Sequence, residues 1–183
     1  MSWEKFCDLN NVSRNLRECN LDSRELIPQE KRVLAKKWIE NPKKGLMLTG
    51  MTGRGKTYFM HCLMRGLLER RDLHALRFFK SKKLDDRLLS DFKQYGSTDY
   101  LLQTLKDVPF LFLDDFGIER EGGRPEREYY DLIDERVEHQ RPMIISTNLS
   151  DANILKTFGD RIHSRLKTCI GIHFDGPDIR ETL

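Results

Sequence analysis

Apolar residues alternate between two spacings along most of the chain. Short, almost continuous apolar runs predict five buried strands, at residues 45–50, 73–80, 108–115, 141–148 and 168–174. Apolar residues at helical spacing predict helices between them, over 28–41, 59–68, 82–94, 98–106 and 129–137, with another starting near Asp151. Strands that alternate with helices predict an α/β fold, in which helices cover both faces of a parallel sheet.

Residues 1–27 show only weak patterning, so we expect a short N-terminal arm followed by one domain over 28–183. Charged residues make up 33% of the chain and the net charge is +3, which permits contact with nucleic acid without requiring it. There is no apolar run of membrane-spanning length and no apolar core of a signal peptide near Met1. The four cysteines show no Cys-x-x-Cys spacing, which favours reduced thiols over a zinc site. We therefore expect a cytoplasmic location.

The most specific motif lies between the first strand and the helix that follows it. Residues 50–57, GMTGRGKT, fit the pattern of a phosphate-binding loop. Glycines let the backbone curl, so that several N–H groups and a helix N-terminus face one anion. We expect Lys56 to reach the β- and γ-phosphates of ATP and the Thr57 hydroxyl to hold Mg²⁺. The whole predicted nucleotide-binding set is Gly50, Met51, Thr52, Gly53, Arg54, Gly55, Lys56, Thr57 and Tyr58. The alternative is a glycine-rich turn that only caps a helix.

Polar side chains follow two further strands. The strand FLFLDD ends in Asp114, which we expect to position Mg²⁺ through its waters, and Asp115, which we expect to act as general base on the attacking water. The alternative is a strand that simply ends in a polar turn. Asn148 ends the fourth strand, where ligands of open parallel sheets bind, and is expected to orient water or contact the γ-phosphate. Its alternative role is to cap the helix near Asp151.

Taken together, residues 28–180 resemble the AAA+ ATPases, and within them the clade of DnaC/DnaI helicase loaders and IstB. The segments that carry the resemblance are LDDFG (113–117), STNLS (146–150), FGDRIHSRL (158–166) and FDGPDIR (174–180). The resemblance implies a P-loop NTPase core of three layers, α/β/α, with a five-stranded parallel sheet ordered 5-1-4-3-2. It also implies ATP with Mg²⁺, head-to-tail self-assembly and no C-terminal helical lid, for which the residues after Leu166 are too few.

The same resemblance implies roles for two arginines. Arg161 matches the arginine finger, which reaches the γ-phosphate held by a neighbouring subunit, and Arg165, four residues on, would assist it. The alternative is a solvated helix with two exposed arginines. Arg180 matches the closing arginine of the clade, and we assign it no role. Asp115 stands where most AAA+ proteins have glutamate, so hydrolysis is expected to be slow unless the protein is assembled or stimulated by a partner.

The segment DFKQYGST (91–98) resembles one that initiator-type members place near single-stranded DNA. Aromatic rings there would stack on bases while lysines meet phosphates. The residues expected to contact DNA are Lys82, Lys83, Phe92, Lys93 and Tyr95. The alternative places Phe92 in the core and leaves the lysines as ordinary surface.

The resemblance implies an ATP-binding and ATP-hydrolysing accessory protein of DNA replication, with a replicative helicase or a transposase-like protein as partner. The alternatives are an IstB-like transposition ATPase, an ATP-switched adaptor that does not depend on hydrolysis, and a small-molecule phosphotransferase. Loaders of this clade carry a separate N-terminal domain that grips the helicase. The short arm at 1–27 leaves such a grip without an evident counterpart.

Overall fold

The structure is a computed structural model of the chain and describes residues 1–23, 25–70, 75–117 and 126–179. A five-stranded sheet, in which every strand pair is parallel, runs through it in the order β2-β3-β4-β1-β5. Its strands are β1 (Leu46–Gly50), β2 (Leu76–Lys80), β3 (Phe110–Asp114), β4 (Met143–Thr147) and β5 (Ile170–Phe174). The predicted parallel sheet and its order are confirmed. Each strand lies inside its predicted range, because the outermost residues of each apolar run belong to the connecting loops.

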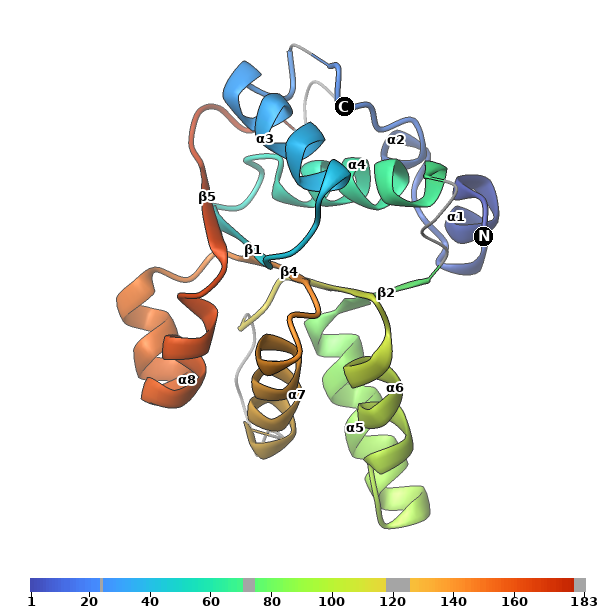
Figure 1. Ribbon diagram of the computed structural model, residues 1–183, viewed down its shortest axis with the longest axis vertical. Helices are drawn as coiled ribbons and strands as arrows, with labels where there is room; N and C mark the ends of the chain where they lie inside the picture. Colours follow the sequence, from blue (N-terminus) through green and yellow to red (C-terminus); the bar gives the residue numbers. More distant parts are fainter. Residues whose placement is uncertain (24, 71–74, 118–125, 180–183) are drawn as a thin grey trace.

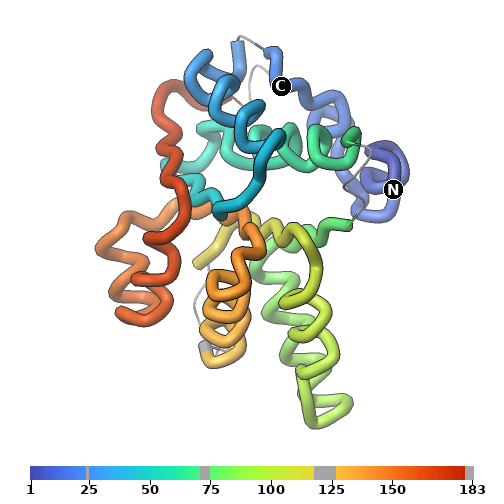
Figure 2. The backbone as a smooth tube through the Cα atoms, in the orientation of Figure 1, coloured from blue at the N-terminus to red at the C-terminus, as the bar shows by residue number. Residues whose placement is uncertain are grey.

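Helices cover both faces of the sheet, as the predicted three-layer arrangement requires (Figure 1). One face carries α1 (Trp3–Leu9), α2 (Arg14–Arg17), α3 (Gln29–Glu40) and α4 (Lys56–Glu69). The other face carries α5 (Ser81–Tyr95), α6 (Asp99–Asp107), α7 (Glu126–Glu138) and α8 (Asp151–Leu166). Helices α5 and α6 lie side by side and project away from the sheet as a hairpin (Figures 1 and 2). Each of the two helix layers buries its own apolar cluster against the sheet.

The first 27 residues are folded against α4. Trp3 and Phe6 of α1 are buried in the same apolar cluster as α4 and the upper face of the sheet. The Asn20 backbone N–H donates to the hydroxyl of Tyr58, 3.1 Å away, and Arg65 donates to the carbonyl of Cys19 at 2.9 Å. The arm therefore lies along the helix that follows the phosphate-binding loop. A domain boundary at residue 28 stays a prediction.

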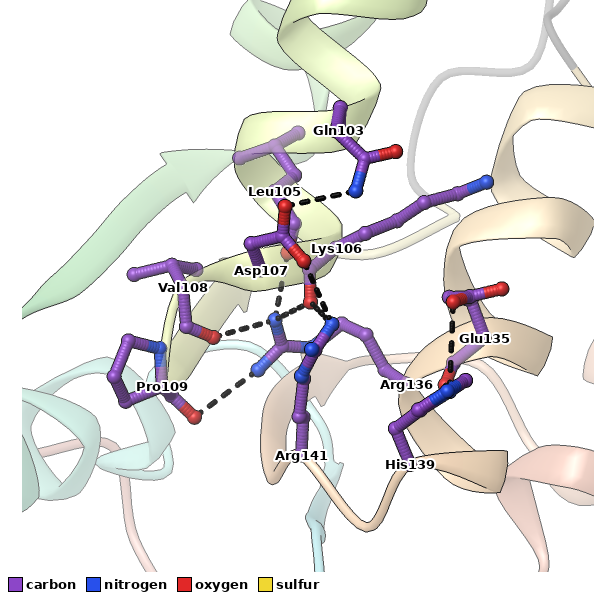
Figure 3. Close-up of polar contacts among 10 residues, drawn as sticks. All are labelled: Gln103, Leu105, Lys106, Asp107, Val108, Pro109, Glu135, Arg136, His139 and Arg141. Atoms are coloured by element: carbon purple, nitrogen blue, oxygen red, sulfur yellow. Dashed lines mark hydrogen bonds and ion pairs between the residues drawn. The ribbon is translucent and has the colours of Figure 1, made fainter.

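Arg136 of α7 is fully buried and joins two segments of the chain, the end of α6 with the loop into β3 and the loop into β4 (Figure 3). Its guanidinium donates to five backbone carbonyls, those of Leu105 (2.6 Å), Lys106 (3.2 Å), Val108 (2.8 Å), Pro109 (3.2 Å) and Pro142 (2.8 Å). The first two belong to the last turn of α6, the negative end of the helix dipole. Burial lowers the pKa of Arg136 to about 9, so the side chain stays protonated at neutral pH. It thereby fixes the entries into β3 and β4.

Within the described residues, no helix is both long enough and apolar enough to cross a membrane. The longest helix, α8, has charged residues on several of its turns.

The burial of His61 on α4 predicts how the free energy of unfolding depends on pH. The side chain is buried near the rings of Trp3 (6.4 Å between centroids) and Phe78 (5.3 Å), and its Nδ1 lies 2.8 Å from the Thr57 carbonyl. Burial lowers its pKa from 6.5 to about 4. Between pH 6.5 and about 4 the unfolded chain therefore binds a proton at His61 that the folded chain does not bind. The free energy of unfolding falls as the pH falls through this range.

We expect the free energy of unfolding to drop by about 2 kcal/mol from pH 7.5 to pH 5 through this residue alone. Urea unfolding at both values measures it, with His61→Leu as the reference that cannot titrate. Equal losses in wild type and variant would contradict the assignment.

Candidate nucleotide-binding site

The carboxyl ends of β1, β3 and β4 meet at one edge of the sheet, where open parallel sheets bind ligands. A pocket of about 590 Å³ opens there. It is lined by residues 52–58 of the predicted loop, by Asp114, Asp115 and Asn148, and by Lys80 at the end of β2. The structure thus brings together residues from strands that are far apart in the sequence.

The glycine-rich segment has the backbone shape that an anion-binding loop requires. Gly50, Gly53 and Gly55 have φ angles of 133°, 81° and 90°, in the region that L side chains rarely adopt. Gly55 is the N-cap of α4 and has no side chain with which to cap this helix. A helix that begins on a glycine-rich loop presents its first N–H groups on bare backbone, which makes the helix end a suitable anion site.

Lys56 is nearly buried inside the curve of this loop. Its Nζ donates to the carbonyls of Gly50 (2.6 Å) and Met51 (2.7 Å). These contacts hold its positive charge against the start of the loop, in the wall of the pocket. Met51 itself points elsewhere: its side chain is 71% exposed, and together with Gly50 it lines a neighbouring cavity. Of the predicted nucleotide-binding set, seven residues line the pocket and these two do not.

Asp114 links the loop to the sheet. Its carboxylate is 1% exposed and accepts from Thr57 Oγ1, which lies 3.1 Å from both of its oxygens, and from Ser146 Oγ at 2.5 Å. Ser146 Oγ in turn accepts from the Asp115 backbone N–H at 3.0 Å. Asp115 has a φ of 57°, so the chain turns sharply just after β3 and leaves Asp115 half-buried in the pocket wall. Asp114 is therefore more than the end of a polar turn, since it is buried and bonded to Thr57.

Hydroxyl and carboxylate oxygens side by side are donors that suit Mg²⁺, which prefers oxygen ligands and keeps several of its waters. Thr57 and Asp114 supply this pair, both from rigid elements, and they fit a magnesium site.

Asn148 connects β4 to the loop. Its Nδ2 donates to Thr52 Oγ1 at 2.8 Å, while its Oδ1 is buried and has no hydrogen-bond partner among the described residues. The alternative role as a helix cap is wrong, because the N-cap of α8 is Ser150, whose hydroxyl accepts from Asn153 N–H at 3.2 Å. Asn148 therefore offers a carbonyl oxygen to the pocket edge.

Several residues of the site were not predicted. Ser146, buried behind the pocket, carries the hydrogen bonds between the two aspartates, but in the sequence it is one of two small polar residues ending an apolar run. The pocket itself is lined in addition by Ser13, Asn15 and Leu16 of the arm and by Ile179 near the C-terminus. Ile179 is fixed there by its N–H, which donates to the Gly53 carbonyl at 2.9 Å. No sequence motif marks the arm residues, since they reach the pocket only through the packing of α1 on α4.

Arg161 and Arg165 lie away from this pocket. Helix α8 is interrupted at Gly159, with φ 75° and ψ 172°, and both arginines follow the break. The Arg161 guanidinium lies 5.7 Å from the ring of Tyr130, and Arg165 Nε pairs with Asp134 at 2.5 Å, which raises the pKa of Arg165. Both arginines therefore contact side chains of α7.

The five residues predicted to contact DNA all lie exposed on α5, on the projecting hairpin (Figure 1). Phe92 is 59% and Tyr95 67% exposed, so the alternative that Phe92 belongs to the core is wrong. Tyr100, at the start of α6, is 89% exposed and was not predicted. Arg180 lies outside the described residues.

Comparison with known proteins agrees with this geometry. A family model described as "IstB-like ATP binding protein" matches residues 10–167. The chromosomal replication initiator protein DnaA of Lachnoclostridium phytofermentans is 24% identical over 141 residues, which cover 76% of this chain but only 30% of the relative. The chain therefore spans less than a third of that protein.

Solved structures share the fold. The crystal structure of the DnaC helicase loader superposes with a TM-score of 0.77 at 23% identity, covering 89% of this chain and all of the other. That of DnaI gives 0.73 at 22% identity, covering 92% and 94%. The replication initiator DnaA bound to AMPPCP and single-stranded DNA gives 0.72 at 17% identity, covering 87% and 50%.

Ser146→Ala tests how the two aspartates are held. The variant removes a donor to Asp114 and leaves the Asp115 N–H without its acceptor, so we expect a loss of about 1–3 kcal/mol in unfolding free energy. We also expect ATP turnover to need several-fold more Mg²⁺. Magnesium titrations of turnover measure this, with exposed Ser90→Ala as the matched control. An unchanged magnesium requirement would show that Ser146 does not position Asp114.

Proposed function

The chain belongs to the family of IstB-like ATP-binding proteins, and we propose that it is a Mg²⁺-dependent ATPase that assembles head to tail and serves DNA replication. The observation that carries this proposal is the Thr57–Asp114–Ser146 arrangement at the mouth of a phosphate-binding loop. A loop that only capped a helix would have no need of a buried carboxylate bonded to its threonine.

Each predicted site residue has a place in this proposal. The N–H groups of residues 53–58 and the Lys56 ammonium bind the phosphates of ATP, and base and ribose lie toward the arm and Ile179. Thr57 and Asp114 would hold Mg²⁺, which would supply positive charge beside the phosphates. Asp115 takes the proton of the attacking water, and the Asn148 carbonyl oxygen orients that water.

The half-buried position of Asp115 suits a residue that must meet water. Its shorter side chain, compared with glutamate, supports a slow basal rate.

Arg161 completes the site of a neighbouring copy in this proposal. It does not line the pocket of its own chain, and its guanidinium is exposed beside Tyr130. An arginine supplied in trans stabilises charge in the transition state and raises the rate about 10³–10⁵-fold. Arg165 pairs with Asp134 of α7 and would hold the part of α8 that carries Arg161 in place. A single copy would then bind ATP but hydrolyse it poorly.

We propose the partners of this chain from the names of the proteins that it resembles. The DnaC similarity favours a replicative helicase, and the family match to IstB-like proteins favours a transposase-like protein; we propose the helicase as the first to test. The DnaA structure bound to single-stranded DNA supports the hairpin of α5 and α6 as a DNA contact. An ATP-switched adaptor is the second candidate, supported by the aspartate at position 115. Turnover stimulated by DNA or helicase separates the two.

Mixing two inactive variants tests the trans site. Arg161→Ala keeps its phosphate-binding loop and should bind ATP, yet turn over roughly 10³-fold more slowly. Lys56→Ala keeps its arginine but should not bind ATP. In a mixture, Arg161→Ala sites lie beside intact arginines, so activity should exceed the sum of the two alone.

The control for this mixture is Arg127→Ala, an exposed arginine of α7, which should remain active. Absence of rescue at any ratio, with co-assembly seen by sedimentation, would rule out the trans arginine.

The hairpin is tested by separating charge from stacking. Replacing Lys82, Lys83 and Lys93 by Gln should flatten the log–log salt dependence of single-stranded DNA binding by about 0.7 for each lost phosphate contact. Replacing Phe92 and Tyr95 by Ala should weaken binding by about 1–3 kcal/mol per stacked base and leave the slope unchanged. Fluorescence anisotropy at several salt concentrations measures both. If neither set changes affinity, the hairpin is not a DNA contact.

A further inference from the structure

A second pocket lies at the opposite edge of the sheet from the phosphate-binding loop. Three loops converge there, those that enter β1, β4 and β5, and the pocket between them measures about 600 Å³. The loops contribute residues 43–45, 140–143 and 167–169. None of the residues assigned to ATP, magnesium or the α5–α6 hairpin lines it.

The backbone of this pocket is closely fixed. A Cβ atom at Gly45 would lie 2.7 Å from the Met143 carbonyl oxygen and 2.8 Å from Cys169 Sγ, so the three loops touch at this point. The Lys44 carbonyl accepts from Trp38 Nε1 at 2.7 Å, and the Gly45 carbonyl accepts from the Ile170 N–H at 2.9 Å. The side chains of the pocket rim are therefore carried on a rigid frame.

Each loop supplies a cation. Lys43 and Lys44 make no ion pair with any described residue, whereas Arg141 pairs with Asp107 at 2.9 Å and Lys167 with Asp151 at 3.8 Å. Among the residues that the structure describes, no carboxylate lines the pocket.

Two carboxylates beside the pocket, Asp107 and Asp151, offset only part of its positive charge. The buried guanidinium of Arg136 also lines the pocket, close to Arg141, and donates to backbone carbonyls (Figure 3). Burial raises the pKa of the Cys169 thiol to about 11, so this group is uncharged at neutral pH. The pocket thus has a strong excess of positive charge.

We propose that this pocket binds the phosphodiester backbone of duplex DNA. Lysine and arginine side chains from separate loops match successive phosphates and carry no sequence information. The described residues that line the pocket include no aromatic side chain, so they offer no stacking platform for unpaired bases. The α5–α6 hairpin differs from this pocket, because its exposed aromatic rings suit single-stranded DNA. The protein would therefore hold duplex at one edge and single strand at the hairpin.

The test is Lys43→Gln combined with Lys44→Gln. Both side chains are exposed, so the variant should unfold at the wild-type temperature. Binding to a short duplex of arbitrary sequence, followed by anisotropy between about 50 and 200 mM salt, should weaken, and its log–log slope should fall by about 0.9 for each lost contact. The matched control is Lys5→Gln with Lys156→Gln, which removes the same charge from exposed positions on α1 and α8 and should keep the wild-type slope.

Equal slopes in the pocket variant and the control would overturn the proposal. Inorganic tripolyphosphate distinguishes the source of the phosphates. If it binds wild type but not the pocket variant while duplex binding is equal in both, the pocket takes a free polyphosphate and the DNA assignment is overturned. Nucleotide binding and the Arg161 mixing experiment use other residues, so failure here leaves the proposed ATPase intact.

Discussion

The buried carboxylate of Asp114 is the interaction on which the organisation of the site depends. A buried charge is costly unless it is hydrogen-bonded, and here the partners come from the start of α4 and from the next strand of the sheet. The same bonds therefore satisfy the carboxylate, set the phosphate-binding loop against β3 and fix the turn at Asp115. Asn148 adds a second link, from the end of β4 to Thr52 of the loop.

Much of this arrangement could be predicted from the sequence. Five apolar runs and the motif at 50–57 suffice to predict a parallel sheet with a nucleotide edge, because a parallel sheet gathers all carboxyl ends on one side. Asp114 and Asn148 follow from their places after such runs. Their partners do not: whether Asn148 bonds to Thr52 or caps α8 depends on a difference of two residues in where the helix begins.

The parts that could not be predicted depend on contacts distant in sequence. The arm has too few apolar residues for a periodic signal, yet Trp3, Phe6 and Ile27 are buried because α4 offers an apolar face to them. In the sequence Arg136 is one more charged residue on an amphipathic helix, and its burial depends on the five carbonyls that two segments, residues 105–109 and Pro142, present to it. Ser146 is similar, since its importance comes from the neighbouring strand.

The pocket at the carboxyl edge is built from the arm, the loop, three strands and residue 179, segments that meet only when nearly the whole chain is folded. A ligand of this pocket can therefore bind the folded chain but not the unfolded chain. Its binding free energy is then added to the stability of the native state, by about 2.7 kcal/mol at a concentration one hundred times the Kd. A ligand that fills this pocket would therefore also lower the unfolded fraction on which proteases act.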